Sequence, residues 1–284
     1  MHSIPLMALV ERTHWLTVLA VGVALTSGCQ APPQVSESSS GATTVSRTGR
    51  DLTTASDETE GRRRARVRLE LAGAYSGQGQ YTTALDEVKQ ALALDNAFVD
   101  AFELRGLIYD ALSEPSLSDD SFKRALQLDE RNGSVLHNYA WSLCRRQQYA
   151  VADAYFARAA DLPLTVGTPK ALLARGVCQT QAGLLPEAEK TLIRAYELTP
   201  SNPAMAYNLA LVLYKRGEYE RARFYARRLN AVPDQVNPES LWLALRIEHK
   251  MSDTQGRDDL AHQLRSRFST SQEVNQLELG RYDD

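Results

Sequence analysis

The stretch that decides the fold is residues 99–166, where two 34-residue blocks follow one another: VDAFELRGLIYDALSEPSLSDDSFKRALQLDERN and GSVLHNYAWSLCRRQQYAVADAYFARAADLPLTV. Small residues recur in step between the blocks, pairing Gly106 with Ala140, Ser118 with Ala152, and Ala125 with Ala159. A fixed period of this length with small residues at fixed places is typical of repeats that are each two antiparallel helices. The sequence therefore predicts an all-α fold built by stacking such pairs.

The same template continues on both sides of this stretch. Its small positions are occupied upstream by Ala72, Ala84 and Ala91, and downstream by Gly176, Ala188 and Ala195 and then by Ala210, Ala222 and Leu229. Large apolar residues stand at another fixed position, namely Phe122, Phe156 and Leu192, where they fill the space beside the small residues. The 34-residue step identifies a tetratricopeptide-repeat superhelix.

We expect the repeat domain to span residues 62–284. Five repeats are expected near residues 65–98, 99–132, 133–166, 169–202 and 203–236, with two residues inserted before the fourth. A degenerate sixth unit starts at Pro238, with helices near residues 240–248 and 257–268. The last unit of a solenoid covers the exposed core, so an atypical sequence is expected there.

An export signal precedes the repeats. Residues 15–25, WLTVLAVGVAL, form an apolar run that is too short for a membrane span, which takes about 20 residues. Arg12 precedes the run and small residues follow it, as in a signal peptide. Met1 and Met7 are both candidate start residues.

The end of this signal, residues 25–29 with the sequence LTSGC, resembles the cleavage site of bacterial lipoproteins. The resemblance implies a signal peptide over residues 1–28 and a mature chain whose first residue, Cys29, carries the lipid (palmitate included). Leu25 lies one step further from the cysteine than is usual, and an ordinary secretory signal with an incidental cysteine is the alternative. Gln30 resembles the residue that directs such lipoproteins to the outer membrane.

Residues 29–61 are rich in Ser, Thr, Gly and Pro and show no apolar period. A segment of this composition buries too little apolar surface to offset the entropy lost on ordering. We expect a disordered tether between the anchor and the repeats.

Two of the three cysteines fall inside the repeats. Cys144 stands at position 12 of the third repeat and Cys178 at position 10 of the fourth, and first helices of adjacent repeats pack side by side. Their offset corresponds to about 3 Å of helix rise. Since an exported chain meets an oxidising compartment, we expect a disulfide between them. Two free buried thiols are the alternative.

The concave surface of the superhelix is the expected partner-binding site, because positions 2, 5, 9, 12 and 13 of each first helix line it in this architecture. The candidate groove residues are Leu69, Leu107, His137, Trp141, Leu173, Val177, Tyr207, Leu211 and Tyr214. An open apolar row suits an apolar or amphipathic partner segment. Trp141 is the expected anchor, since aromatic residues dominate binding hot spots. The alternative is that these side chains pack on neighbouring helices.

Several stretches resemble one family. Residues 137–144, HNYAWSLC, resemble its third-repeat helix, and residues 222–228 (ARFYARR), 240–243 (SLWL) and 264–268 (LRSRF) resemble its C-terminal region. The family is the PilF/PilW type IV pilus biogenesis lipoproteins, or pilotins, and the resemblance covers nearly the whole chain from Cys29. Ala140 and Ser142 depart from the family's usual glycine and bulkier apolar residue.

This resemblance implies a lipid-anchored protein on the periplasmic face of the outer membrane. It implies that the protein binds the type IV pilus secretin, a PilQ-like partner, and promotes its outer-membrane localisation and multimerisation for pilus biogenesis and twitching motility. A generic periplasmic scaffold lipoprotein that organises cell-wall or other secretion machinery is the alternative.

Charge and motifs argue against other classes. The net charge of −3 offers no basic field for nucleic acid. His137, His249 and His262 stand in no catalytic or metal-binding motif, so we expect no enzyme, no cofactor, no metal and no small-molecule substrate. The basic run of Arg62, Arg63, Arg64, Arg66 and Arg68 indicates a solvated helix face, with contact to anionic lipid near the anchor as the alternative.

Overall fold

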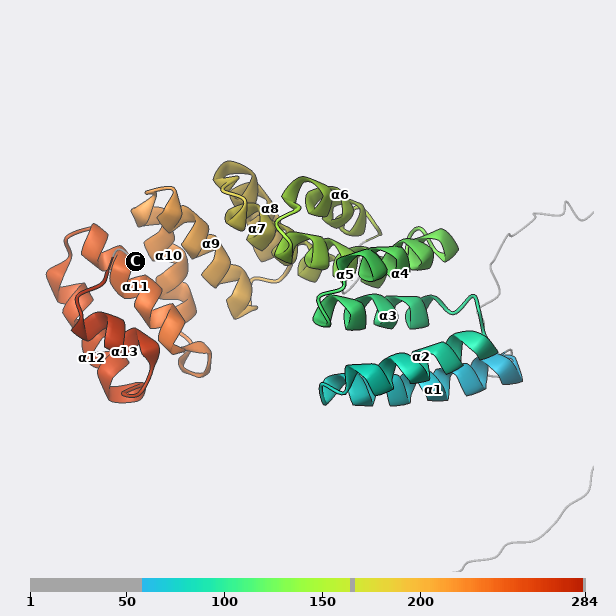
Figure 1. Ribbon diagram of the computed structural model, residues 1–284. Helices are drawn as coiled ribbons and strands as arrows, with labels where there is room; N and C mark the ends of the chain where they lie inside the picture. The colour runs from blue at the N-terminus through green and yellow to red at the C-terminus, as the bar shows by residue number, and fades with distance from the viewer. Residues whose placement is uncertain (1–57, 164–166, 283–284) are drawn as a thin grey trace, which may run out of the picture. The chain divides into compact units, whose positions relative to one another are not determined.

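The structure, a computed structural model, describes residues 58–163 and 167–282. These residues form thirteen α-helices and no strand, which confirms the all-α tetratricopeptide solenoid (Figure 1). The predicted signal peptide, Cys29 and most of the predicted tether lie outside the described residues.

The first twelve helices form six antiparallel pairs that follow one another along the chain. The pairs are α1 (Glu60–Gly77) with α2 (Tyr81–Leu94), α3 (Val99–Ala111) with α4 (Pro115–Leu128), α5 (Gly133–Arg145) with α6 (Tyr149–Ala160), α7 (Gly167–Gln181) with α8 (Leu185–Leu198), α9 (Pro203–Lys215) with α10 (Tyr219–Asn230), and α11 (Pro238–Lys250) with α12 (Thr254–Arg267). A 3-10 turn, η1 (Pro233–Gln235), precedes α11, and a short helix, α13 (Gln272–Glu278), follows α12.

The structure differs from the sequence-based expectation at both ends. Helix α1 begins at Glu60, inside the expected tether, because the Thr59 side chain caps it by accepting from the backbone N–H of Arg62 at 3.1 Å. Helix α13 is additional. It has only seven residues, too few to show a helical period, and it is held by the buried side chains of Val274 and Leu277.

One type of turn joins the two helices of each pair. A single residue in the left-handed region, with φ between 60° and 77°, lies in every one of these turns: Gly79, Ser113, Gln147, Gly183, Gly217 and Ser252. Glycine adopts this conformation without steric cost, which explains its use in three of the six turns. The other three residues accept a modest backbone strain in order to keep the same turn.

In the second and fourth pairs the helices approach closely where a glycine faces a large apolar residue. A Cβ atom placed on Gly106 would lie 2.9 Å from the ring of Phe122, and one on Gly176 would lie 2.5 Å from Cγ of Leu192. Phe122 and Leu192 are both fully buried. The small and large positions of the repeat pattern therefore form one interlocking contact.

Buried carboxylates join successive pairs. Glu103 of α3 accepts from Ser134 and Asn138 of α5, Glu189 of α8 is paired with Arg216 and Arg221 of the next repeat, and Glu248 of α11 is paired with Arg223 and Arg227 of α10. All three glutamates are buried. A buried charge is tolerated only with such partners, so these contacts fix how each repeat meets the next.

The close contact at Gly176 is testable. Gly176→Ala should lower the free energy of unfolding by roughly 1–3 kcal/mol, because the added methyl group overlaps Leu192 in a packed core. Gly73→Ala is the matched control, since a Cβ there meets nothing within 4 Å. That variant should gain up to about 1 kcal/mol from helix propensity. Urea denaturation measures both, and equal effects of the two variants would contradict the packing argument.

Candidate functional site

The first helices of the repeats form a continuous layer, because α1, α3, α5, α7, α9 and α11 each contact the next first helix in this series. All nine predicted groove residues lie on this layer. Leu69 is on α1 and Leu107 on α3; His137 and Trp141 are on α5; Leu173 and Val177 are on α7; Tyr207, Leu211 and Tyr214 are on α9.

Most of these side chains lie between core and solvent. Leu107 is exposed, and Leu69, His137, Trp141, Leu173, Val177, Tyr207 and Leu211 are half-buried. Trp141 packs with part of its surface on a core cluster that spans the second to fourth repeats, and Leu173, Tyr207 and Leu211 pack on the core around α9. Both interpretations of the sequence therefore apply at once: the same residues hold the repeats together and leave apolar surface open.

Tyr214 is not an open groove residue, which corrects the sequence-based expectation. Its side chain is only 9% exposed. Its ring contacts the ring of Tyr219, with centroids 5.7 Å apart, and the guanidinium of Arg246 lies over it at 4.9 Å. Arg246 comes from the degenerate sixth repeat, so the sequence of α9 alone gives no sign of this cover.

His137 lies at a groove position, but its ring is turned toward the core. Its ring packs edge-on against the buried Phe156, with centroids 5.8 Å apart. Its Nδ1 atom is buried and has no hydrogen-bond partner among the described residues. Burial, with a smaller contribution from Lys170, lowers the pKa of His137 to about 4. His137 is therefore a neutral, largely apolar part of the groove wall near pH 7.

A disulfide joins Cys144 of α5 to Cys178 of α7, with Cα atoms 5.9 Å apart. Both residues are almost fully buried. Trp141 lies one helical turn before Cys144, and Val177 directly precedes Cys178. The bridge therefore ties together the two helices that carry the middle of the candidate groove.

A second apolar surface lies on the first repeat. A hollow of about 720 Å³ between α1 and α2 is lined by Arg63, Arg64, Val67, Arg68, Leu71, Gln90, Ala93 and Leu94. Val67 is 50% exposed and Leu71 41% exposed. Sequence reasoning missed this surface, although Val67 and Leu71 stand one turn apart on the face of α1 opposite its buried residues.

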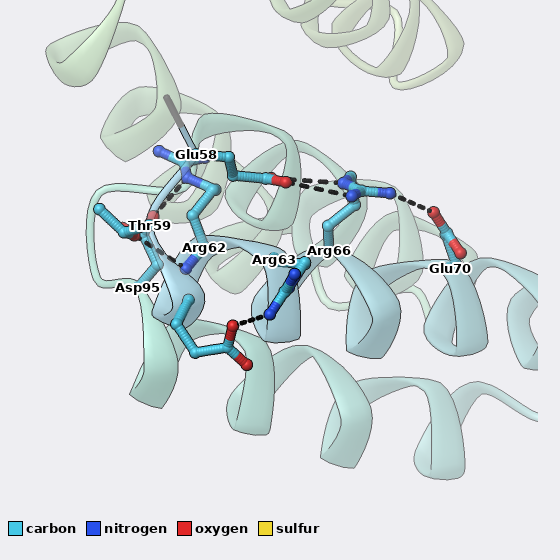
Figure 2. Close-up of polar contacts among 8 residues, drawn as sticks. Glu58, Thr59, Arg62, Arg63, Arg66, Glu70 and Asp95 are labelled. Carbon is cyan, nitrogen blue, oxygen red and sulfur yellow. Dashed lines mark hydrogen bonds and ion pairs between the residues drawn. The ribbon is translucent and has the colours of Figure 1, made fainter. Parts of the chain in front are cut away.

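The basic run on α1 is largely paired with carboxylates. Figure 2 shows Arg62 beside Asp95, and Arg66 between Glu58 and Glu70. Arg63 is paired with Glu60. Arg68 is paired with Glu87 of α2 at 3.0 Å. This internal pairing supports a solvated helix face rather than an open cationic surface.

In residues 58–163 and 167–282, no three potential metal ligands of the His, Cys, Asp or Glu type lie together. None of the helices in these ranges combines the length and the apolar character that crossing a membrane requires.

The chain is similar to one family of repeat proteins and to several known proteins. The tetratricopeptide-repeat family matches residues 139–203 and 186–235. The type IV pilus assembly protein PilF of Pseudomonas aeruginosa is 26% identical over 210 residues, which are 74% of this chain and 83% of that protein. The human DnaJ homolog subfamily C member 7 is 23% identical over 167 residues, which are only 34% of its length.

Two solved structures match most of the chain. The crystal structure of PilW, described as a widely conserved type IV pilus biogenesis factor, aligns with a TM-score of 0.67 at 25% identity, covering 75% of this chain and 97% of PilW. The structure of Pseudomonas aeruginosa PilF aligns with a TM-score of 0.63 at 25% identity, covering 78% of this chain and 100% of that one.

The disulfide should stabilise the groove region. Its cysteines are 34 residues apart, and in the chain-entropy model a loop of that size corresponds to about 3–4 kcal/mol. Reductant should therefore lower the free energy of unfolding by about that amount in urea denaturation. The Cys144→Ser/Cys178→Ser variant is the control, because reductant should not change its stability. Two free thiols in the denatured, unreduced Cys29→Ala protein would rule out the bridge.

His137 should make stability depend on pH. Its pKa is lowered from 6.5 to about 4 on folding, so the unfolded chain takes up a proton first as the pH falls. Stability is complete above about pH 6.5 and declines toward pH 4, by roughly 2–3 kcal/mol at pH 4.5. His137→Gln should remove this part of the decline, whereas His262→Gln, on an exposed helix face, should keep it. Urea denaturation at pH 7 and pH 4.5 measures the change. An equal fall in the free energy of unfolding between these pH values for the parent and His137→Gln would refute the assignment.

Proposed function

We propose that this chain, a tetratricopeptide-repeat protein homologous to PilF, is an outer-membrane lipoprotein that binds the type IV pilus secretin and promotes its localisation and multimerisation. The resemblance seen in the sequence is confirmed by the similarity to PilF and PilW, which supports a part in type IV pilus biogenesis. The proposed activity is that of a protein-binding scaffold and not of an enzyme.

The observation that carries this proposal is the extent of the match. PilF and PilW align over most of their length and most of this chain, including the units beyond the residues that the repeat family matches. A protein that shares only the repeats aligns over a small part of its length, as the human DnaJ homolog does. This difference favours the pilus role over a generic scaffold.

The surfaces described above suit a partner with an apolar or amphipathic segment. The groove offers half-buried apolar side chains on consecutive first helices, held at fixed spacing by the disulfide and by the buried carboxylates. Such a preformed surface binds a segment at low ordering cost. The hollow on the first repeat adds exposed Val67 and Leu71, which fit further apolar side chains of a partner.

Anchoring is the second part of the proposal. Residues 25–29, LTSGC, support lipid attachment at Cys29, and Gln30 supports delivery to the outer membrane. Two or more acyl chains on one residue hold a protein firmly, since a single chain binds membranes only marginally. The anchor would keep the repeats at the periplasmic face, where they meet the secretin.

The test is capture of the secretin from detergent-solubilised membranes by the tagged full-length protein. The secretin should co-purify, and Trp141→Ala should weaken its retention by ~10-fold or more, because truncating an aromatic hot spot costs about 2 kcal/mol. Leu184→Ala is the matched control, since Leu184 is an exposed apolar residue in the turn before α8, outside both surfaces. Circular dichroism checks that each variant is folded.

Other outcomes are equally informative. A folded Trp141→Ala protein that captures the secretin as well as the parent would remove the groove from the proposal. Loss of capture only in Val67→Asp/Leu71→Asp would assign the contact to the first repeat. Cys29→Ala should leave the membrane fraction and still bind the solubilised secretin; normal outer-membrane fractionation of this variant would refute lipid anchoring. Capture of cell-wall enzymes without any secretin would favour the generic scaffold.

A further inference from the structure

Near the C-terminus, the chain folds back onto the last first helix. The ring of Tyr282 is stacked on His249, with centroids 4.3 Å apart and planes 17° apart, and on Trp242, with centroids 5.8 Å apart and planes 23° apart. Nε of Arg246 donates a hydrogen bond to the backbone carbonyl of Tyr282 at 2.8 Å. Three side chains of α11 therefore hold both the ring and the main chain of one residue.

These three side chains occupy the groove positions of the sixth repeat. Helices α9 and α11 both begin with proline, at Pro203 and Pro238, and both are thirteen residues long. In this register Trp242, Arg246 and His249 are equivalent to Tyr207, Leu211 and Tyr214, the three residues of α9 that the sequence predicted for the groove. Arg246 links the two sets directly, because its guanidinium lies over the ring of Tyr214. Tyr282 thus lies on the C-terminal end of the same surface that the other repeats leave open.

The segment that carries Tyr282 is short, and the contact with α11 holds both the ring and the carbonyl of this tyrosine. Helix α13 is anchored in the core by Val274 and Leu277, and Gly280, with φ at 65°, lies in the turn that ends this helix. Gly280 and Arg281 are exposed, and Tyr282 is half-buried. A short segment with few buried atoms opens at low free-energy cost compared with the helices beneath it.

The chemistry of the contact is that of peptide recognition. Trp242 and His249 stack on an aromatic ring, and Arg246 donates a hydrogen bond to a main-chain carbonyl. The surface therefore recognises one aromatic side chain together with the backbone that carries it. We propose that Trp242, Arg246 and His249 form a binding subsite for an aromatic residue in an extended peptide segment of a partner, and that Tyr282 occupies this subsite as an internal ligand that the partner displaces. The inference goes beyond secretin binding and does not require the secretin to be the partner.

An internal ligand weakens binding in a predictable way. A residue tethered next to its site has an effective concentration in the millimolar range, so it competes strongly with a free peptide. Removing Tyr282 should therefore raise the affinity of the chain for a separate peptide that carries an aromatic residue. The effect should be confined to ligands with an aromatic residue.

The experiment measures fluorescence anisotropy of a labelled peptide with the sequence of residues 278–284, ELGRYDD, against the purified full chain. A chain ending at Gly280 and the full-length Tyr282→Ala variant should each bind this peptide at least tenfold more tightly than the parent. A peptide in which alanine replaces the tyrosine should not bind to either. Because Tyr282→Ala keeps the full chain, it tests the idea even if the shortened chain does not fold.

The subsite itself is tested in the Tyr282→Ala background. Arg246→Gln should reduce peptide affinity at least tenfold, since it removes the contact to the main-chain carbonyl. Arg194→Gln, on an exposed face of α8, is the matched control and should change nothing. Equal affinity of the parent and Tyr282→Ala chains, or absence of binding to both up to millimolar peptide, would overturn the proposal. The assay contains no secretin, so its failure is distinct from failure of secretin capture.

Discussion

The close approach of two helices at a glycine or alanine is the constraint on which the rest of this structure depends. At Gly106 and Gly176 there is no room for a side chain, because the buried Phe122 and Leu192 already occupy that space. This contact sets the distance between the helices of a pair and so the thickness of each repeat. Since it recurs along the chain, the first helices line up as one layer, and side chains at equivalent positions face the same way.

A second set of contacts, between buried glutamates and residues of the neighbouring repeat, holds successive helix pairs together. Buried glutamates at three junctions are each held by donors of the neighbouring repeat, and the disulfide joins the third repeat to the fourth. Directional contacts of this kind specify one relative position, whereas apolar packing alone tolerates sliding. The spacing between apolar groove residues on successive helices is therefore fixed before any partner arrives.

Within the part of the chain that the structure describes, the first and last repeats differ in how their outer faces are covered. The first repeat leaves Val67 and Leu71 exposed beside paired arginines, so its outer face stays available. At the other end, α12 and α13 cover the core around Leu241 and Leu245, and Tyr282 returns to the first-helix surface. An array of units with one shared architecture thus has chemically distinct ends.

The sequence by itself determined the repeat, its register and the pairing of Cys144 with Cys178 as an expectation. Each of these follows from helix geometry, in which an offset along the chain translates directly into a position on a helix face. Only the tertiary structure decided which groove residues stay open. Tyr214 is covered by Arg246, His137 turns to Phe156, and Tyr282 reaches α11 from beyond the last repeat. These contacts depend on side-chain orientation and on segments outside the period, and a repeat pattern carries no information about either.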